Sequence, residues 1–296
     1  MYKVYIDGSE GTTGLQIRTR LAEISAVEVI TLPDGLRKDN TARREAMESA
    51  NVTVLCLPDE AALEAVALAD SGKTRFLDAS TAHRVTDGWT YGLPELSPGQ
   101  SALIAASGRV SNPGCHATGA IILLNPLIRN GILSPDSNIA ITSLTGYTGG
   151  GKKMISEYEA ANRSGEYSSH RVYALSGNHK HLPEITKYSG LSLTPAIIPV
   201  VGDFPQGMQV LIPLFDISRE LVYKTLKDWY APYENISVTD DFPAYAATNA
   251  LAGSDKLAIS VAGSGDRPIV SATFDNLGKG AAGAAVRNLS LMLGIT

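Results

Sequence analysis

The stretch VSNPGCHATGAI places one of only two cysteines in a 296-residue chain after a proline-glycine turn. The apolar run after Cys115 predicts a helix that begins near this residue. A thiolate is the nucleophilic form of cysteine, and the partial positive charge at a helix amino terminus favours it. Cys56 lies within the strand-like NVTVLCL and is interpreted as a small core hydrophobe. Cys115 is therefore the candidate nucleophile, with an inert packed thiol as the alternative.

A cysteine nucleophile needs an acid or base nearby, and the segment SGNHKHLPEI offers one. It holds His179, His181 and Glu184, although the whole chain has only five histidines. In an extended stretch the two histidines would point to the same face. Such a pair with a carboxylate could also bind zinc, but no H-x-H, H-E-x-x-H or D-x-H motif elsewhere supplies further ligands. We expect no metal, and a purely structural histidine pair remains open.

A glycine-rich loop, GSEGTTG, follows the first strand-like segment and precedes a helix-like one. At such a turn backbone N–H groups and the helix dipole can bind a phosphate. The candidate dinucleotide-binding residues of the loop are Gly8, Ser9, Gly11, Thr12, Thr13 and Gly14. The spacing differs from G-x-G-x-x-G, and a tight turn without a ligand is the alternative.

The end of the second strand carries the signal for the kind of dinucleotide. An NAD enzyme often places a carboxylate there for the ribose 2′-hydroxyl. Here Leu32 and Pro33 are followed by Asp34 and then by the basic pair Arg37 and Lys38. Two cations favour a 2′-phosphate and hence NADP, and a solvated helix start is the alternative.

Three further stretches carry residues suited to anions or to a flat cofactor. DASTAHR supplies Arg84, whose guanidinium can bind a phosphate or carboxylate with two hydrogen bonds. TGYTGGGKKM supplies Gly149 and Gly150 in a glycine-rich loop, and DNLGKGAAGAA supplies Asn276. Each stretch alone could be an ordinary turn, but together they support one shared cleft.

The elements that must position these residues fall into two patterns. In the first third of the chain, strand-like and helix-like segments alternate, which predicts a doubly wound parallel sheet. The strands are expected at 2–7, 27–32, 51–57 and 75–80, and the helices at 12–24, 37–50 and 59–70. After Cys115 strands outnumber helices, which predicts a second domain with a mixed or antiparallel sheet. Its strands are expected at 139–144, 171–175, 196–201, 208–215, 256–262 and 269–274, with a helix at 219–230 and a last one at 280–294. The fold class is therefore α/β, a Rossmann-type parallel sheet plus an α+β domain.

Composition excludes several classes of function. The net charge of −5 with interspersed signs offers no basic stripe for nucleic acid or an acidic membrane surface. Two distant cysteines form no disulfide framework, which favours a reducing cytosol. The amino terminus shows no charged-then-apolar signal, and no run of eighteen apolar residues occurs. We expect a cytoplasmic protein.

Together these motifs resemble the N-acetyl-gamma-glutamyl-phosphate reductases, in particular their shorter form, which are related to aspartate-semialdehyde dehydrogenase. The resemblance covers essentially the whole chain, and SNPGCHATGA is its most specific motif. The other motifs that carry it are IDGSEGTTGLQI, LCLPDEAA, DASTAHR, YGLPEL, TGYTGGGK, NHKHLPEI and DNLGKGAAGAA.

The resemblance implies an NADPH-dependent reduction of an acyl phosphate to an aldehyde with release of inorganic phosphate. Cys115 would form a thioester and His179 would be the general acid/base. Arg84, His181 and Glu184 would hold the substrate, and Asn112 could stabilise an oxyanion. Residues 1–113 and 278–296 would form the dinucleotide-binding domain. Residues 114–277 would form the catalytic and dimerisation domain of a homodimer or homotetramer.

Three alternatives stay open. The same chemistry could act on aspartyl or acetyl-aminoadipyl phosphate, since one methylene changes little in a sequence. A metal-dependent hydrolase could use His179 and His181. A module that senses NADP could use the glycine loop without any role for Cys115.

Overall fold

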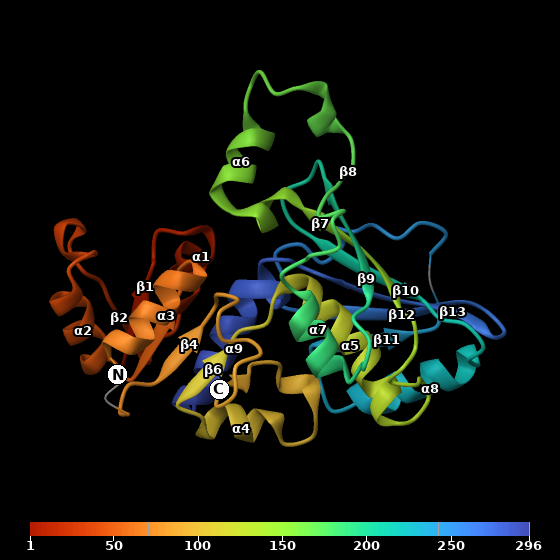
Figure 1. The fold of residues 1–296 in the computed structure, drawn as a ribbon, viewed down its shortest axis with the longest axis horizontal. Coiled ribbons are helices and arrows are strands. Elements are labelled where there is room, and N and C mark those ends of the chain that lie inside the picture. The colour runs from red at the N-terminus through yellow and green to blue at the C-terminus, as the bar shows by residue number, and fades with distance from the viewer. Residues whose placement is uncertain (70–71, 242, 296) are drawn as a thin grey trace. The chain divides into compact units, whose positions relative to one another are not determined.

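The computed structural model describes residues 1–69, 72–241 and 243–295. The chain divides into two compact units, of which the first is Met1–Pro113 with Ala281–Thr296 and the second is Gly114–Gly280. Each unit contains one of the two β-sheets (Figure 1).

The first unit is built on a six-stranded parallel sheet with the order β2-β1-β3-β4-β6-β5. Its strands are β1 (Tyr2–Asp7), β2 (Val27–Ile30), β3 (Val52–Leu55), β4 (Phe76–Asp78), β5 (Thr90–Tyr91) and β6 (Arg109–Ser111). Its helices are α1 (Thr12–Leu21), α2 (Asn40–Ser49), α3 (Asp59–Leu68), α4 (Gln100–Ala106) and α9 (Gly283–Leu293), with short 3₁₀ turns at Asp34–Leu36 and Pro94–Leu96. The predicted Rossmann-type sheet is confirmed.

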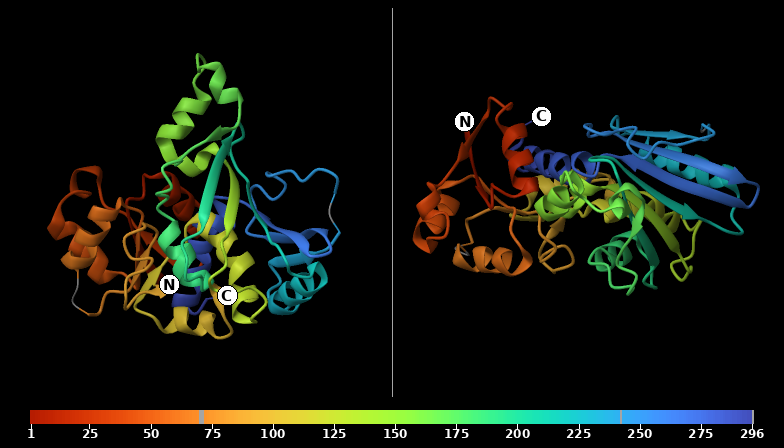
Figure 2. Two further views of the ribbon diagram at one scale, coloured as in Figure 1. Left: turned by 45° about the vertical axis from the view of Figure 1, so that its right-hand side comes forward. Right: turned by 90° about the horizontal axis from the view of Figure 1, so that it is seen from above.

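Side chains alternate along the strands of this sheet, and helices pack on both of its faces. Val4 and Ile6 of β1 pack with Leu289 in one apolar cluster, which includes residues of α1 and α9. Tyr5 points to the other face and packs with Met47 in a second cluster, which includes residues of α2 and α3. Figure 2 shows α1 and α9 side by side.

The second unit holds a seven-stranded mixed sheet with the order β11-β12-β13-β10-β7-β9-β8. Its strands are β7 (Ala140–Gly146), β8 (Arg171–Val172), β9 (Ala196–Gly202), β10 (Met208–Pro213), β11 (Ile236–Thr239), β12 (Leu257–Ser264) and β13 (Arg267–Phe274). Its helices are α5 (Cys115–Arg129), α6 (Gly151–Glu159), α7 (Leu182–Ser189) and α8 (Arg219–Tyr230), with 3₁₀ turns at Tyr147–Gly150 and Gly165–Ser168. A π-helical turn, Gly278–Ala282, leads into α9. The expected mixed sheet is confirmed.

Helix α5 lies close against this sheet. A Cβ added at Gly119 would lie 2.5 Å from Cγ2 of Val210 and 2.9 Å from the Phe274 ring. Glycine at this position lets the helix backbone approach β10 and β13, and this approach places the start of α5 against the sheet.

Several expected boundaries were wrong. The helix expected at 37–50 begins at Asn40, where the Asp39 side chain accepts a hydrogen bond from the Ala42 N–H at 2.8 Å. The helix expected at 59–70 is described to Leu68, and its expected last residue, 70, lies outside the described residues. Helix α9 begins at Gly283, after the π-helical turn, instead of at 280. Among the residues that the structure describes, no helix combines the length and apolar character needed to cross a membrane.

Candidate active site

Cys115 is the first residue of α5, as the sequence predicted, and is half-buried. Gly114 forms the N-cap in an extended conformation, and no side chain caps the helix. The partial positive charge of this helix amino terminus therefore acts on Cys115. Cys56 follows β3, and burial, with the carboxylates of Asp78 and Asp7, raises its pKa to about 12. That thiol stays protonated near neutral pH, which agrees with its interpretation as a core residue.

His116 is a site residue that the sequence analysis did not single out. Its ring is 3 % exposed and both ring nitrogens are bonded: Nδ1 lies 2.7 Å from Ser143 Oγ and Nε2 lies 2.8 Å from the Tyr173 hydroxyl. Burial, and to a smaller extent His179 and Lys180, lowers the pKa of His116 to about 3. The imidazole is therefore neutral beside Cys115.

His179 and His181 do lie together, but not in the extended segment that was considered. They occupy the turn before α7, and His181 is the N-cap of that helix in an α-helical conformation. Their ring centroids are 4.8 Å apart, and those of His116 and His179 are 4.9 Å apart. The turn brings the rings together because the backbone N–H of His181 donates to Nδ1 of His179 at 3.2 Å.

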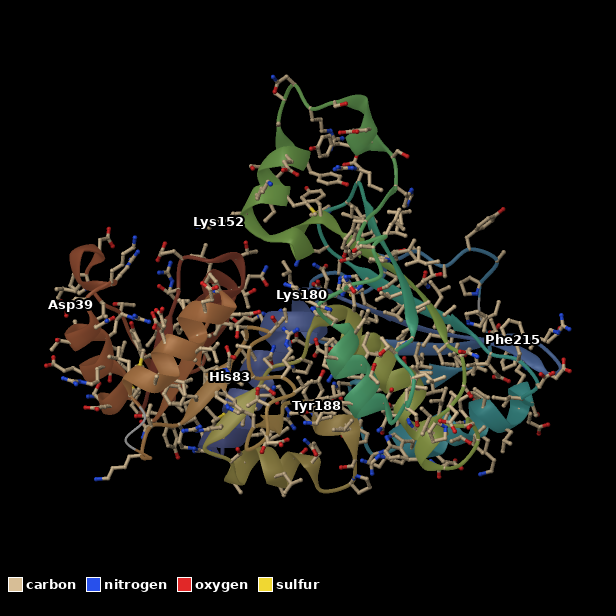
Figure 3. The ribbon with its side chains drawn as sticks, viewed as in Figure 1. Asp39, His83, Lys152, Lys180, Tyr188 and Phe215 are labelled. Atoms are coloured by element: carbon tan, nitrogen blue, oxygen red, sulfur yellow. The ribbon has the colours of Figure 1, made fainter. Side chains whose placement is uncertain are left out.

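This backbone bond fixes the tautomer of His179. Because Nδ1 accepts a hydrogen bond, the proton of the neutral ring is on Nε2. Burial, and secondarily the charge of Lys180, lowers the pKa of His179. Lys180, between the two histidines, is labelled in Figure 3. His179 therefore offers an Nε2–H donor at neutral pH.

Glu184 ties α7 to the start of α5. Its carboxylate is almost fully buried, and Oε2 accepts a hydrogen bond from the Gly114 N–H at 3.1 Å. Its Oε1 lies 4.0 Å from Nε2 of His181. The carboxylate thus fixes the backbone immediately before Cys115. The structure brings Cys115, His179, His181 and Glu184 into one cluster.

The same cluster has spacing that a metal ion could use. The Cys115 sulfur and one ring nitrogen each of His116 and His181 lie within 4.8 Å of one another. Both ring nitrogens of His116 already bond to Ser143 and Tyr173, so a metal ion would have to break one of these bonds. The arrangement fits a polar network better than a metal centre.

The glycine loop of the first unit is pressed against β3. Gly8 has a φ of 83°, and a Cβ there would lie 2.4 Å from the Cys56 carbonyl oxygen. A Cβ at Gly14 would lie 2.5 Å from the Gly8 carbonyl oxygen. Both positions require glycine, because a side chain at either one would collide with a backbone carbonyl group.

The amino terminus of α1 fits a phosphate group. Gly11 is its N-cap, no side chain caps it, and its first turn carries no acidic residue. Thr12 Oγ1 is buried and has no hydrogen-bond partner within the described parts of the chain. A bound phosphate would satisfy this hydroxyl and the N–H groups of the first turn, so the loop suits a dinucleotide.

Arg37 lies beside this loop. Its guanidinium is 2.9 Å from Asp34 and 3.4 Å from Glu10, which belongs to the loop itself. Strand β2 ends at Ile30, and Lys38 is exposed nearby in sequence. A cation is therefore held next to the glycine loop, where the sequence analysis expected a 2′-phosphate site.

Arg84 and Asn112 also belong to the first unit and bond to each other. Arg84 is buried, and its Nε donates to the Asn112 carbonyl oxygen at 3.0 Å. The Asn112 side chain donates to the Ala281 carbonyl at 3.0 Å and accepts from Asn288 at 3.0 Å. Beside Arg84, His83 (labelled in Figure 3) is 2.7 Å from Asp78. These bonds fix the end of β4 and the segment after β6.

Gly149, Gly150 and Asn276 lie in the second unit. Asn276 donates to Thr148 Oγ1 at 3.1 Å and accepts from the Gly207 N–H at 2.9 Å, so its amide connects two loops. A Cβ at Gly149 would lie 3.5 Å from Nδ2 of Asn276, and one at Gly150 would collide with Met154. Of these three predicted cofactor-binding residues, Asn276 holds two loops together, and Gly149 and Gly150 keep their own loop compact.

Comparison with known proteins defines the class. The aspartate semialdehyde dehydrogenase II from Vibrio cholerae has the same fold, with a TM-score of 0.76, 16 % identity and 99 % of each chain covered. The aspartate semialdehyde dehydrogenase from Candida albicans, solved with NADP, has a TM-score of 0.70 at 13 % identity, again over 99 % of each chain. Residues 115–276 match the family described as semialdehyde dehydrogenase, dimerisation domain. The fold and the family match are those of a semialdehyde dehydrogenase-type oxidoreductase.

Two sequence relatives narrow the class. The N-acetyl-gamma-glutamyl-phosphate reductase 2 of Pseudomonas putida is 44 % identical and covers 98 % of this chain and 96 % of its own length. The N-acetyl-gamma-glutamyl-phosphate reductase of Brucella anthropi is 43 % identical and covers 99 % of this chain and 98 % of its own length. The chain belongs to the N-acetyl-gamma-glutamyl-phosphate reductase family.

Proposed function

We propose that this enzyme reduces N-acetyl-gamma-glutamyl phosphate with NADPH to N-acetylglutamate 5-semialdehyde and inorganic phosphate, a reaction of arginine biosynthesis. The observation that carries the proposal is Cys115 at the first position of α5 beside the imidazoles of His179 and His181, in a chain of this family.

The proposed chemistry is covalent. The Cys115 thiolate attacks the acyl carbon, the bond from that carbon to the phosphate oxygen breaks, and a thioester forms as phosphate leaves. The chemistry that NADPH would supply there, when bound, is a hydride for the thioester carbon. The carbon–sulfur bond then breaks, which releases the aldehyde and restores the thiolate. The reaction consumes one proton overall, which the departing phosphate takes up.

The residues around Cys115 divide these tasks. The Nε2–H of His179 donates a hydrogen bond to the oxygen that becomes negative in each tetrahedral intermediate, and the proton that the departing phosphate takes up comes from solvent. His181 and Arg84 bind the anionic groups of the substrate. Asn112, whose amide bonds to Ala281 and Asn288, holds the carbonyl that accepts from Arg84. The Glu184 carboxylate, held by the Gly114 N–H, mainly positions Cys115.

We infer that NADP(H) binds to the first unit. The glycine loop fits its pyrophosphate, Thr12 Oγ1 offers an unsatisfied hydroxyl, and Arg37 with Lys38 supplies charge for the 2′-phosphate. The Candida albicans relative, solved with NADP, agrees with this choice.

We also propose that the second unit mediates a homodimer or homotetramer. The pairing register of β7, β9, β10 and β13 places uncharged side chains on the sheet face opposite α5. These side chains are Thr142, Leu144, Ile198, Val200, Gln209, Leu211, Ser271 and Thr273. The matched family is described as a dimerisation domain. The two cysteines, without a disulfide framework, support a cytoplasmic location.

The reaction run in reverse tests the proposal. Purified enzyme receives NADP, phosphate and one of three semialdehydes derived from acetylglutamate, aspartate or acetyl-aminoadipate, and NADPH absorbance is followed. We expect NADPH only with phosphate present and fastest with N-acetylglutamate semialdehyde. Cys115→Ser should show no turnover while it still binds NADPH. A preference for another aldehyde would correct the acyl chain, and turnover without phosphate would contradict the acyl-phosphate reaction.

A further inference from the structure

A hydrogen-bonded chain of three side chains, none used in the steps above, ends beside Cys115. Ser143 of β7 bonds to Nδ1 of His116 at 2.7 Å, and Nε2 of His116 bonds to the Tyr173 hydroxyl at 2.8 Å. Ser143 and His116 are buried, and His116 directly follows Cys115 in α5.

The burial of Ser143 sets the direction of the protons in this chain. Within the described residues the one hydrogen-bond partner of its hydroxyl is Nδ1 of His116. If Nδ1 carried the proton, the serine O–H would be buried without an acceptor, which is costly. The serine therefore donates to Nδ1, and the proton of the neutral His116 ring is on Nε2.

The Nε2–H of His116 then donates to the Tyr173 oxygen. The tyrosine proton is not needed for this bond and is free to point elsewhere. Burial, and secondarily the negative charge of Cys115, raises the pKa of Tyr173, so the phenol remains protonated. A ring nitrogen of His116 and the Cys115 sulfur lie within 4.8 Å of each other, which places the sulfur near this network.

The backbone after Tyr173 shows strain of the kind found at functional sites. Ala174 has a φ of 52°, a left-handed conformation that costs a non-glycine residue roughly 1–2 kcal/mol. Its carbonyl accepts from the Gly177 N–H at 3.1 Å, and this turn leads on to His179. The local fold therefore keeps Tyr173 beside the histidines at the expense of a strained residue.

We propose that Tyr173 donates its hydroxyl hydrogen to the Cys115 sulfur, and that Ser143 and His116 are positioning residues that keep the proton in this direction. The bond favours the thiolate before attack and again when the thiolate leaves the product. This proposal rests on the proposed function only in taking Cys115 as the nucleophile. Titratable and charged side chains on the elements around Cys115 include His116, Tyr173, His179, Lys180, His181, Glu184, Asp275 and Lys279, with Arg129 and Lys187 toward the far ends of α5 and α7.

The ionisation of Cys115 tests the proposal without substrate or cofactor. The ultraviolet absorbance of the thiolate and the rate of iodoacetamide alkylation are measured against pH, with Cys115→Ser as the blank. Tyr173→Phe, which removes only the hydroxyl, should move the midpoint upward by about one to two pH units, the size expected for one hydrogen bond to a charged group. Tyr230→Phe removes another buried tyrosine hydroxyl, bonded to the Ile122 carbonyl, and should leave the midpoint in place.

A double-mutant cycle tests the positioning role. Ser143→Ala should also raise the midpoint, but by less than Tyr173→Phe does. The expected change is roughly threefold in proton concentration, because without the serine hydroxyl the His116 proton is no longer held on Nε2. In the Tyr173→Phe background Ser143→Ala should cause no further shift. His116→Gln, whose amide can still donate near the Nε2 position, should retain a lower midpoint than His116→Asn.

An unchanged midpoint in Tyr173→Phe would overturn the proposal, even if turnover falls. Equal shifts from Ser143→Ala in both backgrounds would overturn the positioning role. Failure of the proposed function would appear separately, as wild-type enzyme that forms no NADPH in the reverse reaction while the midpoint shifts are still observed.

Discussion

Two imidazoles beside Cys115, those of His116 and His179, are held neutral. Burial is the largest cause of the lowered pKa of both residues. A cationic imidazole would stabilise a neighbouring thiolate, but the cost of desolvating that cation outweighs the attraction here. The thiolate must instead be stabilised by N–H donors at the start of α5 and by hydroxyl or imidazole hydrogens. This explains why a chain of neutral hydrogen bonds reaches the site.

The buried neutral His116 predicts a loss of stability in acid. Its pKa is about 3 in the folded chain and 6.5 in the unfolded chain, so the unfolded chain binds more protons between these values. The contribution of neutral His116 to the free energy of unfolding is therefore fully present above pH 6.5 and is lost as the pH decreases toward 3. Between pH 7 and pH 5 this group should cost about 2 kcal/mol of the free energy of unfolding.

Urea unfolding at pH 7 and pH 5 measures this effect. His116→Gln cannot titrate and should lose less stability than wild type over this interval, whatever its stability at pH 7. The exposed His170 provides the matched control, since His170→Gln should behave as wild type. Equal losses in wild type and His116→Gln would show that His116 is already neutral in the unfolded chain or charged in the folded one.

Unusual residue types at short spacing mark Cys115, His179, His181 and Glu184 in the sequence, and the structure brings these four residues into one cluster. Sequence reasoning missed His116 and Tyr173 for physical reasons. A histidine in the first turn of an apolar helix shows no partner in sequence, since Ser143 and Tyr173 are 27 and 57 positions away. Tyr173 fell in an expected strand, where an aromatic residue is ordinary. Only the fold shows that these side chains meet.

At the scale of elements, the π-helical turn Gly278–Ala282 constrains Cys115. A Cβ at Gly280 would lie 2.9 Å from Cβ of Cys115 and 3.1 Å from the Asp275 carbonyl oxygen. Gly280→Ala should therefore displace Cys115, the proposed nucleophile, and lower kcat on the order of 10²-fold, with NADPH affinity little changed. Gly165→Ala, in open space in the same unit, is the control. Normal turnover in Gly280→Ala would mean that the turn yields without moving Cys115.

The glycine loop and the end of β2 together predict cofactor preference. Arg37→Ala combined with Lys38→Ala should weaken NADP binding about tenfold or more, because charge-assisted bonds to the 2′-phosphate are lost. NAD binding should change little. Lys73→Ala removes an exposed cation elsewhere in the first unit and serves as the control. Fluorescence titration with both cofactors measures the effect, and equal losses for NAD and NADP would remove the pair from 2′-phosphate recognition.

Long periodic elements were predictable and short ones were not. The helix expected at 219–230 and the strand expected at 2–7 match α8 and β1 residue for residue. The region 84–113 yielded no element, although it contains β5, β6 and α4. These are two, three and seven residues long, too short for a period to emerge. They depend on tertiary contacts: β6 pairs with β4, β5 pairs with β6, and α4 packs against α9. The α6 helix was read as part of a loop because glycines precede it.

At the scale of the whole molecule, the chain leaves its first unit after Pro113 and returns to it at Ala281. Cys115 lies two residues after the first crossing, and Gly280, which packs against Cys115, immediately precedes the second. Cys115 is thus placed where the sequence passes between units, while the glycine loop belongs wholly to the first unit. Because both termini build the first unit, the second unit is one continuous insertion.

The second unit also carries the surface proposed for assembly. Ile198 of β9 is 45 % exposed in the isolated chain and lies on the uncharged sheet face proposed as the oligomer interface. A symmetric dimer interface uses the same patch twice, so Ile198→Glu would bury two carboxylates in one contact. Each buried, unpaired charge costs several kcal/mol, which is enough to dissociate a dimer at micromolar concentration. Sedimentation velocity should show wild type as an oligomer and Ile198→Glu as a folded monomer. Leu103→Glu changes a more exposed leucine of α4 in the first unit and should leave the oligomer intact, whereas an unchanged mass for Ile198→Glu would place the interface on another surface.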